Sequence, residues 1–437
     1  MKTLLKNARI LTMKDDNIFF GDVSIEDGII KEVGKVNQDE HFDEVVDCEG
    51  NLLMPGFKNA HAHSSMTFLR SVADDSSLED WLFKEIFPRE ANIVDGSIYD
   101  LGKVALLEYL TSGITSIMDQ YFLTAEFRQL CLDFGFRCVV NLMYDKNKRP
   151  YDFCMNAFNT WNKDPNSLVK MTVSMHAEYT SDEEMIAQNK RLLEETQSPF
   201  YTHLGETLNE VNDCVKRRGM TAVQYLNSLH FFDNGGAIFH GIYLTKEDRK
   251  IIKDKDVVIV TCPGSNMKLA SGVADISGYL KEGITVALGT DGPASNNGLD
   301  MFKEMYLVTG LQKLLHKNPV SIPAFEVLKM ATVNGAKAMG LENGKYLEPG
   351  SLADIIMIDM SRPSMQPINN IINNLVYSGS KDVIKMTMIN GKILYFDGKF
   401  RINEDISAIY KKAQEWTEKL KIIKKQEETG EIVSKLM

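Results

Sequence analysis

Two histidines, His61 and His63, lie two residues apart at the end of a short apolar run that follows Pro55-Gly56. Residues i and i+2 of a strand point to the same face, so both imidazoles can bind one metal ion from the end of a single strand. Neutral imidazole is a common ligand of zinc and related ions. The pair therefore predicts a metal site, and the alternative is a chance pairing on a loop among the eight histidines of the chain.

Further polar residues end other apolar runs, at His176, His203, His240 and Asp291, and Glu206 follows His203 by three residues. Each has an ordinary explanation when it is taken alone. A single His is as often a core or hydrogen-bonding residue as a functional one, and an Asp before Gly is often a turn residue. Their recurrence at equivalent strand ends favours one shared site.

The chemistry that this set supports is metal-assisted hydrolysis. We predict that His61, His63, His203 and Asp291 bind one divalent ion per subunit, with zinc as the default and Fe²⁺ or Mn²⁺ as ions that suit the same ligands. Such an ion lowers the pKa of a water molecule from about 16 to roughly 7. Asp291 can accept the proton of that water, His240 can orient it, and Glu206 can act as general acid or base.

Eight β-rich runs, separated by stretches with helical spacing of apolar residues, are placed to hold these side chains. Eight is the number that closes a (β/α)₈ barrel, in which catalytic groups come from the carboxyl ends of different strands. The insertion from Ser64 to Ala91 is too long for a simple loop and is expected to cover the mouth of the barrel. The runs are 54–61, 114–119, 136–142, 169–176, 199–203, 236–240, 256–261 and 284–290. Helices are expected at 98–110, 182–195, 222–230 and 299–317.

Both ends of the chain carry short alternating runs with Asp-Gly and Asn-Gly turns, at 2–34 and at 353–396. We therefore expect an α/β protein, with a TIM-like barrel and a small discontinuous β-sandwich domain formed by both ends. The predicted division is 1–53 with 347–402 for the β-sandwich, 54–346 for the catalytic barrel and 403–437 for a C-terminal helical extension.

Composition excludes several classes of protein. The 437 residues carry a net charge of −11, which argues against nucleic-acid binding, and no run approaches the ~18 apolar residues of a membrane helix. The N-terminus does not resemble a signal peptide. The six cysteines show no close paired spacing, which is typical of reduced thiols. We predict a cytoplasmic enzyme that binds neither nucleic acid nor membrane.

These motifs resemble those of the amidohydrolase superfamily: His61-x-His63, His203 with Glu206, His240 and Thr290-Asp291-Gly292. The resemblance covers essentially the whole chain. Superfamily members with two metals usually carry a Lys at the end of the fourth strand, and His176 in its place implies a mononuclear site. Within the superfamily the chain is most similar to the 5-methylthioadenosine/S-adenosylhomocysteine deaminases. The stretches that carry this similarity are His61–Arg70, Trp81-Leu82-Phe83 with Glu90, and Asp291–Asn297.

That resemblance implies a hydrolytic deaminase of adenosine-type nucleosides that releases ammonia and the inosine analogue. Glu90 would bind the ribose hydroxyls, Trp81 would pack near the thioether, and His176 would hydrogen-bond the nucleoside. Glu206 would protonate the purine N1, and Asp291 would pass the proton of water to the departing ammonia. The resemblance also adds Ser295 to the substrate-binding residues and suggests a homo-oligomer.

One departure bears on substrate choice. Family members that accept S-adenosylhomocysteine place an Arg in the third strand, where this chain has Val140-Asn141-Leu142. Asn141 can hydrogen-bond a carboxylate but lacks the charged fork of Arg, and Arg149 could substitute if its loop folds inward. Methylthioadenosine, adenosine and 5-deoxyadenosine are therefore expected to be better substrates than S-adenosylhomocysteine.

Two other kinds of function fit parts of the sequence. One is another amidohydrolase reaction, such as guanine or pterin deamination, or dechlorination or deamination of s-triazines, because one fold serves many leaving groups. The other is a non-catalytic binding or scaffold protein, which the complete set of candidate catalytic residues disfavours.

Overall fold

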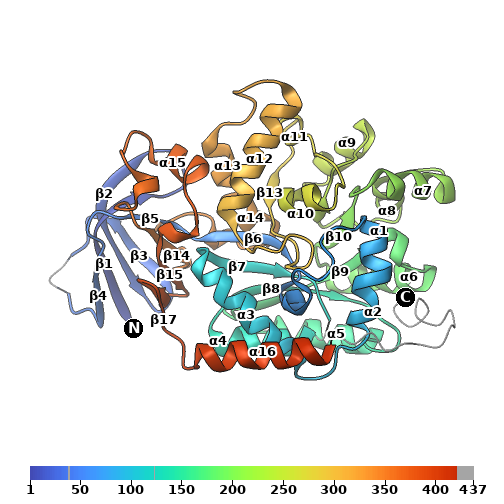
Figure 1. Cartoon of the computed structure of the whole chain (residues 1–437), viewed down its shortest axis with the longest axis horizontal. Coiled ribbons are helices and arrows are strands. Elements are labelled where there is room, and N and C mark those ends of the chain that lie inside the picture. Colours follow the sequence, from blue (N-terminus) through green and yellow to red (C-terminus); the bar gives the residue numbers. More distant parts are fainter. Residues whose placement is uncertain (38–39, 123, 421–437) are drawn as a thin grey trace.

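A computed structural model describes residues 1–37, 40–122 and 124–420 of the chain. Within these residues, an eight-stranded parallel sheet forms a barrel, and a separate mixed sheet of nine strands combines both ends of the chain (Figure 1). Parallel strands that alternate with helices bury both faces of a sheet, which explains why the barrel strands are almost continuously apolar. The predicted fold class is confirmed.

The barrel strands coincide closely with the eight predicted runs. The first run, 54–61, divides at Gly56, because Leu52–Pro55 (β5) belongs to the terminal sheet and the barrel begins at Phe57. The backbone N–H of Asp291 donates to the carbonyl of His61 (3.0 Å) and closes the barrel between its last and first strands. The strands are Phe57–Ala62 (β6), Ile114–Asp119 (β7), Arg137–Met143 (β8), Val169–Ala177 (β9), Phe200–Leu204 (β10), Gly236–His240 (β11), Val257–Thr261 (β12) and Val286–Leu288 (β13).

Helices follow the barrel strands and pack around them (Figure 1). The four predicted helices are present within two residues at each end, as α3, α6, α8 and α12. The bounds are Ser97–Thr111 (α3), Thr124–Phe134 (α4), Tyr151–Trp161 (α5), Glu183–Thr196 (α6), Leu208–Arg218 (α7), Ala222–Ser228 (α8), Lys246–Asp254 (α9), Pro263–Lys268 (α10), Ile276–Lys281 (α11), Met301–His316 (α12), Ala324–Met330 (α13) and Val333–Ala338 (α14).

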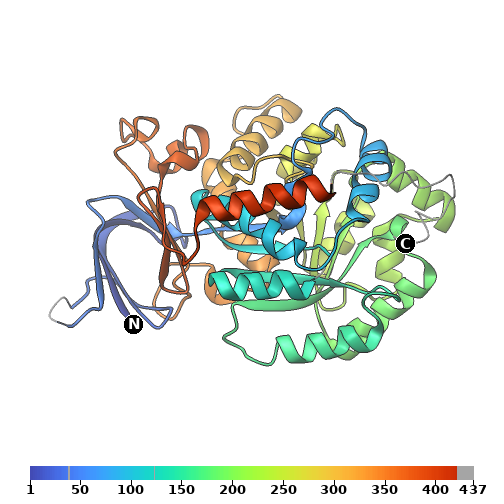
Figure 2. The ribbon, with the colours of Figure 1, turned by 60° about the horizontal axis from the view of Figure 1, so that its bottom comes forward.

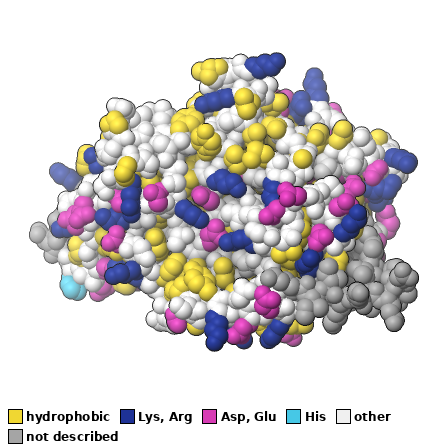
Figure 3. Space-filling view, viewed as in Figure 1, with side chains coloured by type: hydrophobic (Ala, Val, Ile, Leu, Met, Phe, Trp, Pro, Cys, Tyr) yellow, Lys and Arg dark blue, Asp and Glu magenta, His cyan; other side chains and the backbone are white. Residues whose placement is uncertain are grey.

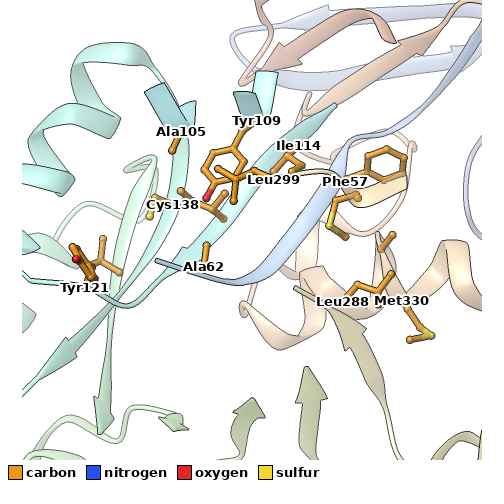
Figure 4. Close-up of a cluster of buried hydrophobic side chains, with 14 of the residues drawn as sticks. Phe57, Ala62, Ala105, Tyr109, Ile114, Tyr121, Cys138, Leu288, Leu299 and Met330 are labelled. Carbon is orange, nitrogen blue, oxygen red and sulfur yellow. The ribbon is translucent and has the colours of Figure 1, made fainter. Parts of the chain in front are cut away.

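The insertion after β6 folds into short helical turns. It comprises a 3₁₀ segment Ser64–Leu69 (η1), Leu78–Asp80 (α1), a π-helical segment Trp81–Ile86 (η2) and Phe87–Glu90 (α2). Buried side chains of β6, β7 and α3 belong to the main core, among them Phe57 and Ala62 at the two ends of β6, Tyr109 of α3 and Ile114 of β7 (Figure 4). This packing fixes the strand that carries His61.

The terminal unit is one curved sheet rather than two separate ones. Its arms face each other across a shared apolar core to which both ends of the chain contribute (Figure 2). Its strands are Lys2–Leu11 (β1), Ile18–Glu26 (β2), Ile29–Gly34 (β3), Glu44–Asp47 (β4), β5, Ile355–Ile358 (β14), Ile384–Ile389 (β15), Lys392–Phe396 (β16) and Lys399–Phe400 (β17). The exact domain boundaries stay a prediction.

Within the predicted C-terminal extension lies a helix, Ile406–Leu420 (α16), which packs against α3. Residues 421–437 of that extension lie outside the described residues. Ile371–Tyr377 (α15) precedes it in the chain. No helix within the described ranges is both long and apolar enough to cross a membrane. On the face seen in Figure 3, basic and acidic side chains are interspersed rather than gathered by sign.

A buried ion cluster joins the barrel to the terminal sheet. Asp354 accepts hydrogen bonds from Arg137 Nε (2.5 Å) and from the backbone N–H of Asn390 (2.8 Å), and Lys58 Nζ lies 3.9 Å from its Oδ2. All three charged side chains are almost fully buried. Burial raises the pKa of Asp354, but Arg137 and Lys58 outweigh burial and hold it below its usual value.

Asp354→Asn is expected to lower the free energy of unfolding by about 3–5 kcal/mol, because it leaves buried cations without their partner. Thermal unfolding measures this, and Asp256→Asn, at an exposed ion pair with Lys337, is the control with little effect. The lowered pKa of Asp354 means that its stabilisation is present above the unfolded-state pKa of about 3.9 and is lost as pH falls through the folded-state pKa. Equal stability of the two variants would contradict this role.

Candidate active site

The predicted metal ligands converge at the carboxyl ends of the barrel strands. His61 belongs to β6, His63 follows it, His203 belongs to β10, and Asp291 lies three residues beyond β13. Asp291 Oδ1 lies 3.5 Å from His61 Nε2 and 3.2 Å from His63 Nε2. The ring centroids of His61 and His203 are 4.8 Å apart. Residues that are far apart in the sequence thus form one compact cluster.

The cluster fits a divalent metal ion. Both ring nitrogens of His61 are buried and have no hydrogen-bond partner among the described residues. Two groups of ligand atoms, His61 with His203 and His240, and His61 with His63 and Asp291, each lie within 4.8 Å of one another. Neutral imidazoles and one carboxylate are the donor set of hydrolytic zinc sites. His240 therefore lies close enough to His61 and His203 to bind the same ion, although the sequence predicts that it orients the water instead.

Hydrogen bonds to the second ring nitrogens fix two of these imidazoles. His63 Nδ1 lies 2.5 Å from the carbonyl oxygen of Gln120, and His203 Nδ1 lies 2.7 Å from that of His176. A carbonyl oxygen can only accept a hydrogen bond, so Nδ1 carries the proton in each neutral ring. Nε2 then keeps its lone pair and can bind a metal ion. Burial lowers the pKa of His61 to about 3, which keeps its ring neutral.

The three predicted proton-handling residues lie together, with Asp291 inside the cluster and Glu206 and His240 beside it. His240 Nε2 is 3.8 Å from Glu206 Oε2, and Ser265 Oγ donates to Asp291 Oδ2 (2.6 Å). Burial raises the pKa of Glu206 above its usual value. For Asp291 burial also acts to raise the pKa, but contact with His61 and His63 holds it well below the usual range. The two carboxyls thus differ, and Glu206 is the better proton donor.

The backbone is strained at the same place. His240 and Asp291 adopt positive φ angles of 71° and 60°, which are uncommon for residues other than Gly. Non-glycine residues in this region persist where surrounding structure holds them, and they cluster at functional sites. Gly289 approaches β6 so closely that a Cβ there would lie 2.8 Å from His61 Cβ. The close approach brings Asp291 to the histidines.

A cavity opens above the cluster, and the insertion supplies one wall of it, as the sequence predicts. Trp81 and Glu90 from the insertion and His176 from β9 all line this cavity. Burial raises the pKa of Glu90 to about 7, and Tyr121 donates a hydrogen bond to its Oε1 (2.6 Å). Apolar side chains line much of the rest of the cavity: Met66, Leu78, Leu82, Ile86, Phe87, Phe122, Met143 and Leu269.

Three predicted substrate-binding residues lie elsewhere. Asn141 lies two residues before the lining residue Met143, and its Oδ1 accepts from Thr172 Oγ1 (2.7 Å). Ser295 is buried and donates to the carbonyl of Gly292 (3.1 Å). Neither is among the described residues that line the cavity. Arg149 lines a neighbouring pocket that shares Glu90 and Phe122 with the cavity.

Sequence reasoning missed residues at the ends of two strands. Gln120 and Tyr121 follow β7, and Ser265 and Asn266 follow β12, where Asn266 Oδ1 lies 2.7 Å from His240 Nδ1. All four could have been found by the rule that located the histidines, because they too follow the carboxyl ends of barrel strands.

Comparison with known proteins gives a family match over most of the chain. The Amidohydrolase family model matches residues 52–394. A 5'-deoxyadenosine deaminase of Methanosphaera stadtmanae is 36% identical over 413 residues, covering 93% of this chain and 96% of the relative. A 5-methylthioadenosine/S-adenosylhomocysteine deaminase of Pyrococcus furiosus is 37% identical over 409 residues, covering 92% and 97%.

Solved structures of known enzymes superpose on nearly the whole chain. An adenosine deaminase from Xanthomonas campestris with bound zinc superposes with a TM-score of 0.90 at 27% identity, covering 96% of this chain and 98% of the other. An atrazine chlorohydrolase from Arthrobacter aurescens superposes with a TM-score of 0.87 at 21% identity, covering 95% and 100%. The second likeness shows the fold alone.

Proposed function

The chain belongs to the amidohydrolase family, and we propose that the cluster of His61, His63, His203 and Asp291 is the metal centre with which it deaminates adenosine-type nucleosides. The chain is a hydrolase of C–N bonds. The observation that carries the substrate class is similarity along nearly the whole chain to deaminases of 5'-deoxyadenosine and of 5-methylthioadenosine and S-adenosylhomocysteine. Neither alternative, a different amidohydrolase reaction or a scaffold role, has an observation in its favour.

The donor set supports one divalent ion per subunit, held by His61, His63, His203 and Asp291, and we propose zinc. A bound ion supplies Lewis acidity, which lowers the pKa of a water molecule from about 16 to roughly 7. The carbonyls of Gln120 and His176 accept hydrogen bonds from Nδ1 of His63 and His203, and so hold the two rings in the orientation that metal binding requires.

Deamination adds water at C6 of the purine and breaks the bond from C6 to the amino nitrogen. We assign the donation of a proton to N1 to Glu206, whose raised pKa favours the protonated form. Asp291 accepts a proton from the attacking water and passes it to the departing ammonia. His240 hydrogen-bonds the water, and its own Nδ1 is held by Asn266. One water enters and one ammonia leaves. The second proton of the water leaves the hydroxyl on C6 as the C6=O bond forms and returns Glu206 to its protonated form, so atoms and protons balance.

The cavity supports the proposed nucleoside contacts of three residues. Glu90 is a buried carboxyl, so its oxygens can accept hydrogen bonds from ribose hydroxyls. Trp81 offers an apolar ring to a 5'-substituent, and His176 presents its ring to the cavity with Nδ1 paired to Thr180 Oγ1 (2.9 Å). Asn141 and Ser295 are not among the described residues that line the cavity and receive no role in this proposal.

Glu90→Gln tests the nucleoside assignment. We expect kcat/KM for adenosine and methylthioadenosine to fall about 10- to 100-fold, because the amide replaces one of the two carboxyl oxygens that can accept from the ribose hydroxyls. Steady-state ammonia release measures it. Glu85→Gln, in the same insertion and partly exposed, is the control with near-normal activity. Unchanged nucleoside turnover in Glu90→Gln, or activity on a free base such as guanine that exceeds that on nucleosides, would contradict the assignment.

Neutral nucleosides are expected to be turned over at least about tenfold better than S-adenosylhomocysteine, as judged by kcat/KM. No Lys or Arg is among the described residues that line the cavity, and the Nε of Arg149 donates to the carbonyl of Met143 (2.6 Å). An amino-acid carboxylate therefore lacks a charged partner there. Comparable kcat/KM values for neutral nucleosides and S-adenosylhomocysteine would contradict this. In that case, a loss of activity on S-adenosylhomocysteine alone in Arg149→Met would show that Arg149 binds the substrate carboxylate.

The predicted cytoplasmic location and homo-oligomeric state rest on the sequence and stay predictions. All six cysteines are buried and free, which supports reduced thiols.

A further inference from the structure

The short helix α10 connects Asp291 and His240, the two residues that the proposed mechanism places beside the attacking water. Its consecutive residues Ser265 and Asn266 reach different partners: Ser265 Oγ donates to Asp291 Oδ2 (2.6 Å), and Asn266 Oδ1 accepts from His240 Nδ1 (2.7 Å). A small movement of α10 would therefore displace the hydrogen-bond partners of Asp291 and His240 together. Whatever fixes α10 controls the geometry of both.

The helix does not fix its own first turn. Its N-cap, Cys262, makes no side-chain capping hydrogen bond, and Pro263 has no N–H to offer. The next N–H, of Gly264, donates to Glu304 Oε2 (2.8 Å). A carboxylate from another helix, α12, thus takes the place of the missing N-cap acceptor.

The same carboxylate holds the loop on the other side of the site. Glu304 Oε1 accepts from Asn296 Nδ2 (2.8 Å), which also donates to the carbonyl of Thr290 (2.8 Å), the residue before Asp291. Lys303 Nζ donates to Asn296 Oδ1 (2.7 Å). Because the amide oxygen is taken by an ammonium group, Asn296 can present only N–H to Glu304.

We propose that Glu304 is a positioning residue for the deamination: it anchors α10 and the loop that contains Asn296, and so keeps Asp291 and His240 in their reactive arrangement. This inference rests on the proposed function for its kinetic readout. Glu304 is fully buried, and it is not among the described residues that line the cavity. A Cβ on Gly264 would lie 2.5 Å from Glu304 Oε1, so the groups are packed without room for a bridging water.

Glu304→Gln is a sharp test because it preserves size and removes one acceptor. Both partners of Glu304 are N–H donors, so a glutamine must turn its own NH₂ toward one of them. We expect kcat to fall at least tenfold and KM to change less than about threefold. Glu304→Asp, which keeps two acceptor oxygens, is expected to retain more of kcat than Glu304→Gln.

Asp300→Ala is the matched control. Asp300 caps α12 through the N–H groups of Phe302 and Lys303, so its loss weakens the same helix without removing a contact of Glu304. Thermal unfolding of both variants shows whether they are destabilised alike. We expect Asp300→Ala to keep kcat within about threefold of wild type at a comparable loss of thermal stability.

A second readout does not depend on the substrate. The visible absorption of protein loaded with Co²⁺ reports the ligand geometry, and we expect it to change in Glu304→Gln but not in Asp300→Ala. An unchanged spectrum in Glu304→Gln, a kcat within threefold of wild type, or an equal loss of kcat in Asp300→Ala would overturn the positioning role. If wild-type protein deaminates no adenosine derivative, the proposed function fails, and the Co²⁺ spectra still decide the role of Glu304.

Discussion

Replacing Asp291 with Asn is expected to lower kcat/KM for adenosine-type nucleosides by about 10⁴-fold, the upper end of what loss of a general base costs. Asn has almost the same shape but no negative charge to place 3.5 and 3.2 Å from the Nε2 atoms of His61 and His63. It also cannot accept the proton of the attacking water. Steady-state kinetics, with metal content measured in parallel, separate loss of the ion from loss of the base.

Ser265→Ala is the matched control for that substitution. It removes one hydrogen bond to Asp291 Oδ2 and leaves the carboxylate in place, so a loss of about 10- to 100-fold is expected. If Asp291→Asn with a full complement of metal kept activity within tenfold of wild type, Asp291 would be neither the base nor a needed ligand.

Glu206→Gln is expected to lower kcat by about 10²- to 10⁴-fold with little change in KM. The amide fills the same space beside His240 but has no acidic proton for the ring nitrogen of the purine. Ammonia release under saturating substrate measures kcat, and a separate titration with the inosine product checks that binding survives.

The control for Glu206 is Glu79→Gln. Glu79 is an exposed carboxylate of the insertion that accepts a hydrogen bond from Asn209 (3.2 Å), and it does not line the cavity in the part of the chain that the structure describes. Near-normal kcat is expected there. A Glu206→Gln enzyme as fast as Glu79→Gln would show that another group protonates the substrate.

Much of this site could be predicted because metal chemistry restricts residue type and barrel topology restricts position. His61, His63, His203, His240 and Asp291 each end a strand run that is readable from apolar clustering, and the parallel sheet brings all such ends to one rim. The predicted runs lie within a few residues of the strands because buried parallel strands are almost continuously apolar.

Depth along a strand was less predictable. Asn141 and Met143 share one face of β8, but only Met143 lines the cavity. Asn141 lies two residues earlier on the strand, deeper in the barrel, and accepts a hydrogen bond from Thr172. Alternation gives the face of a side chain, not its height in the barrel. The role of Glu304 was equally hidden, because it depends on a contact between α12 and α10 that only packing creates. The strained backbone of His240 leaves no clear trace in residue type either.

The most direct test of metal-dependent nucleoside deamination is ammonia release from zinc-loaded protein incubated with methylthioadenosine, 5-deoxyadenosine, adenosine, S-adenosylhomocysteine, guanine and cytosine. We predict one ammonia per inosine analogue formed from the adenosine derivatives, loss of that activity on chelation, and its return when zinc is restored. A protein shown to hold one metal ion per subunit that releases no ammonia from any adenosine derivative would contradict the account.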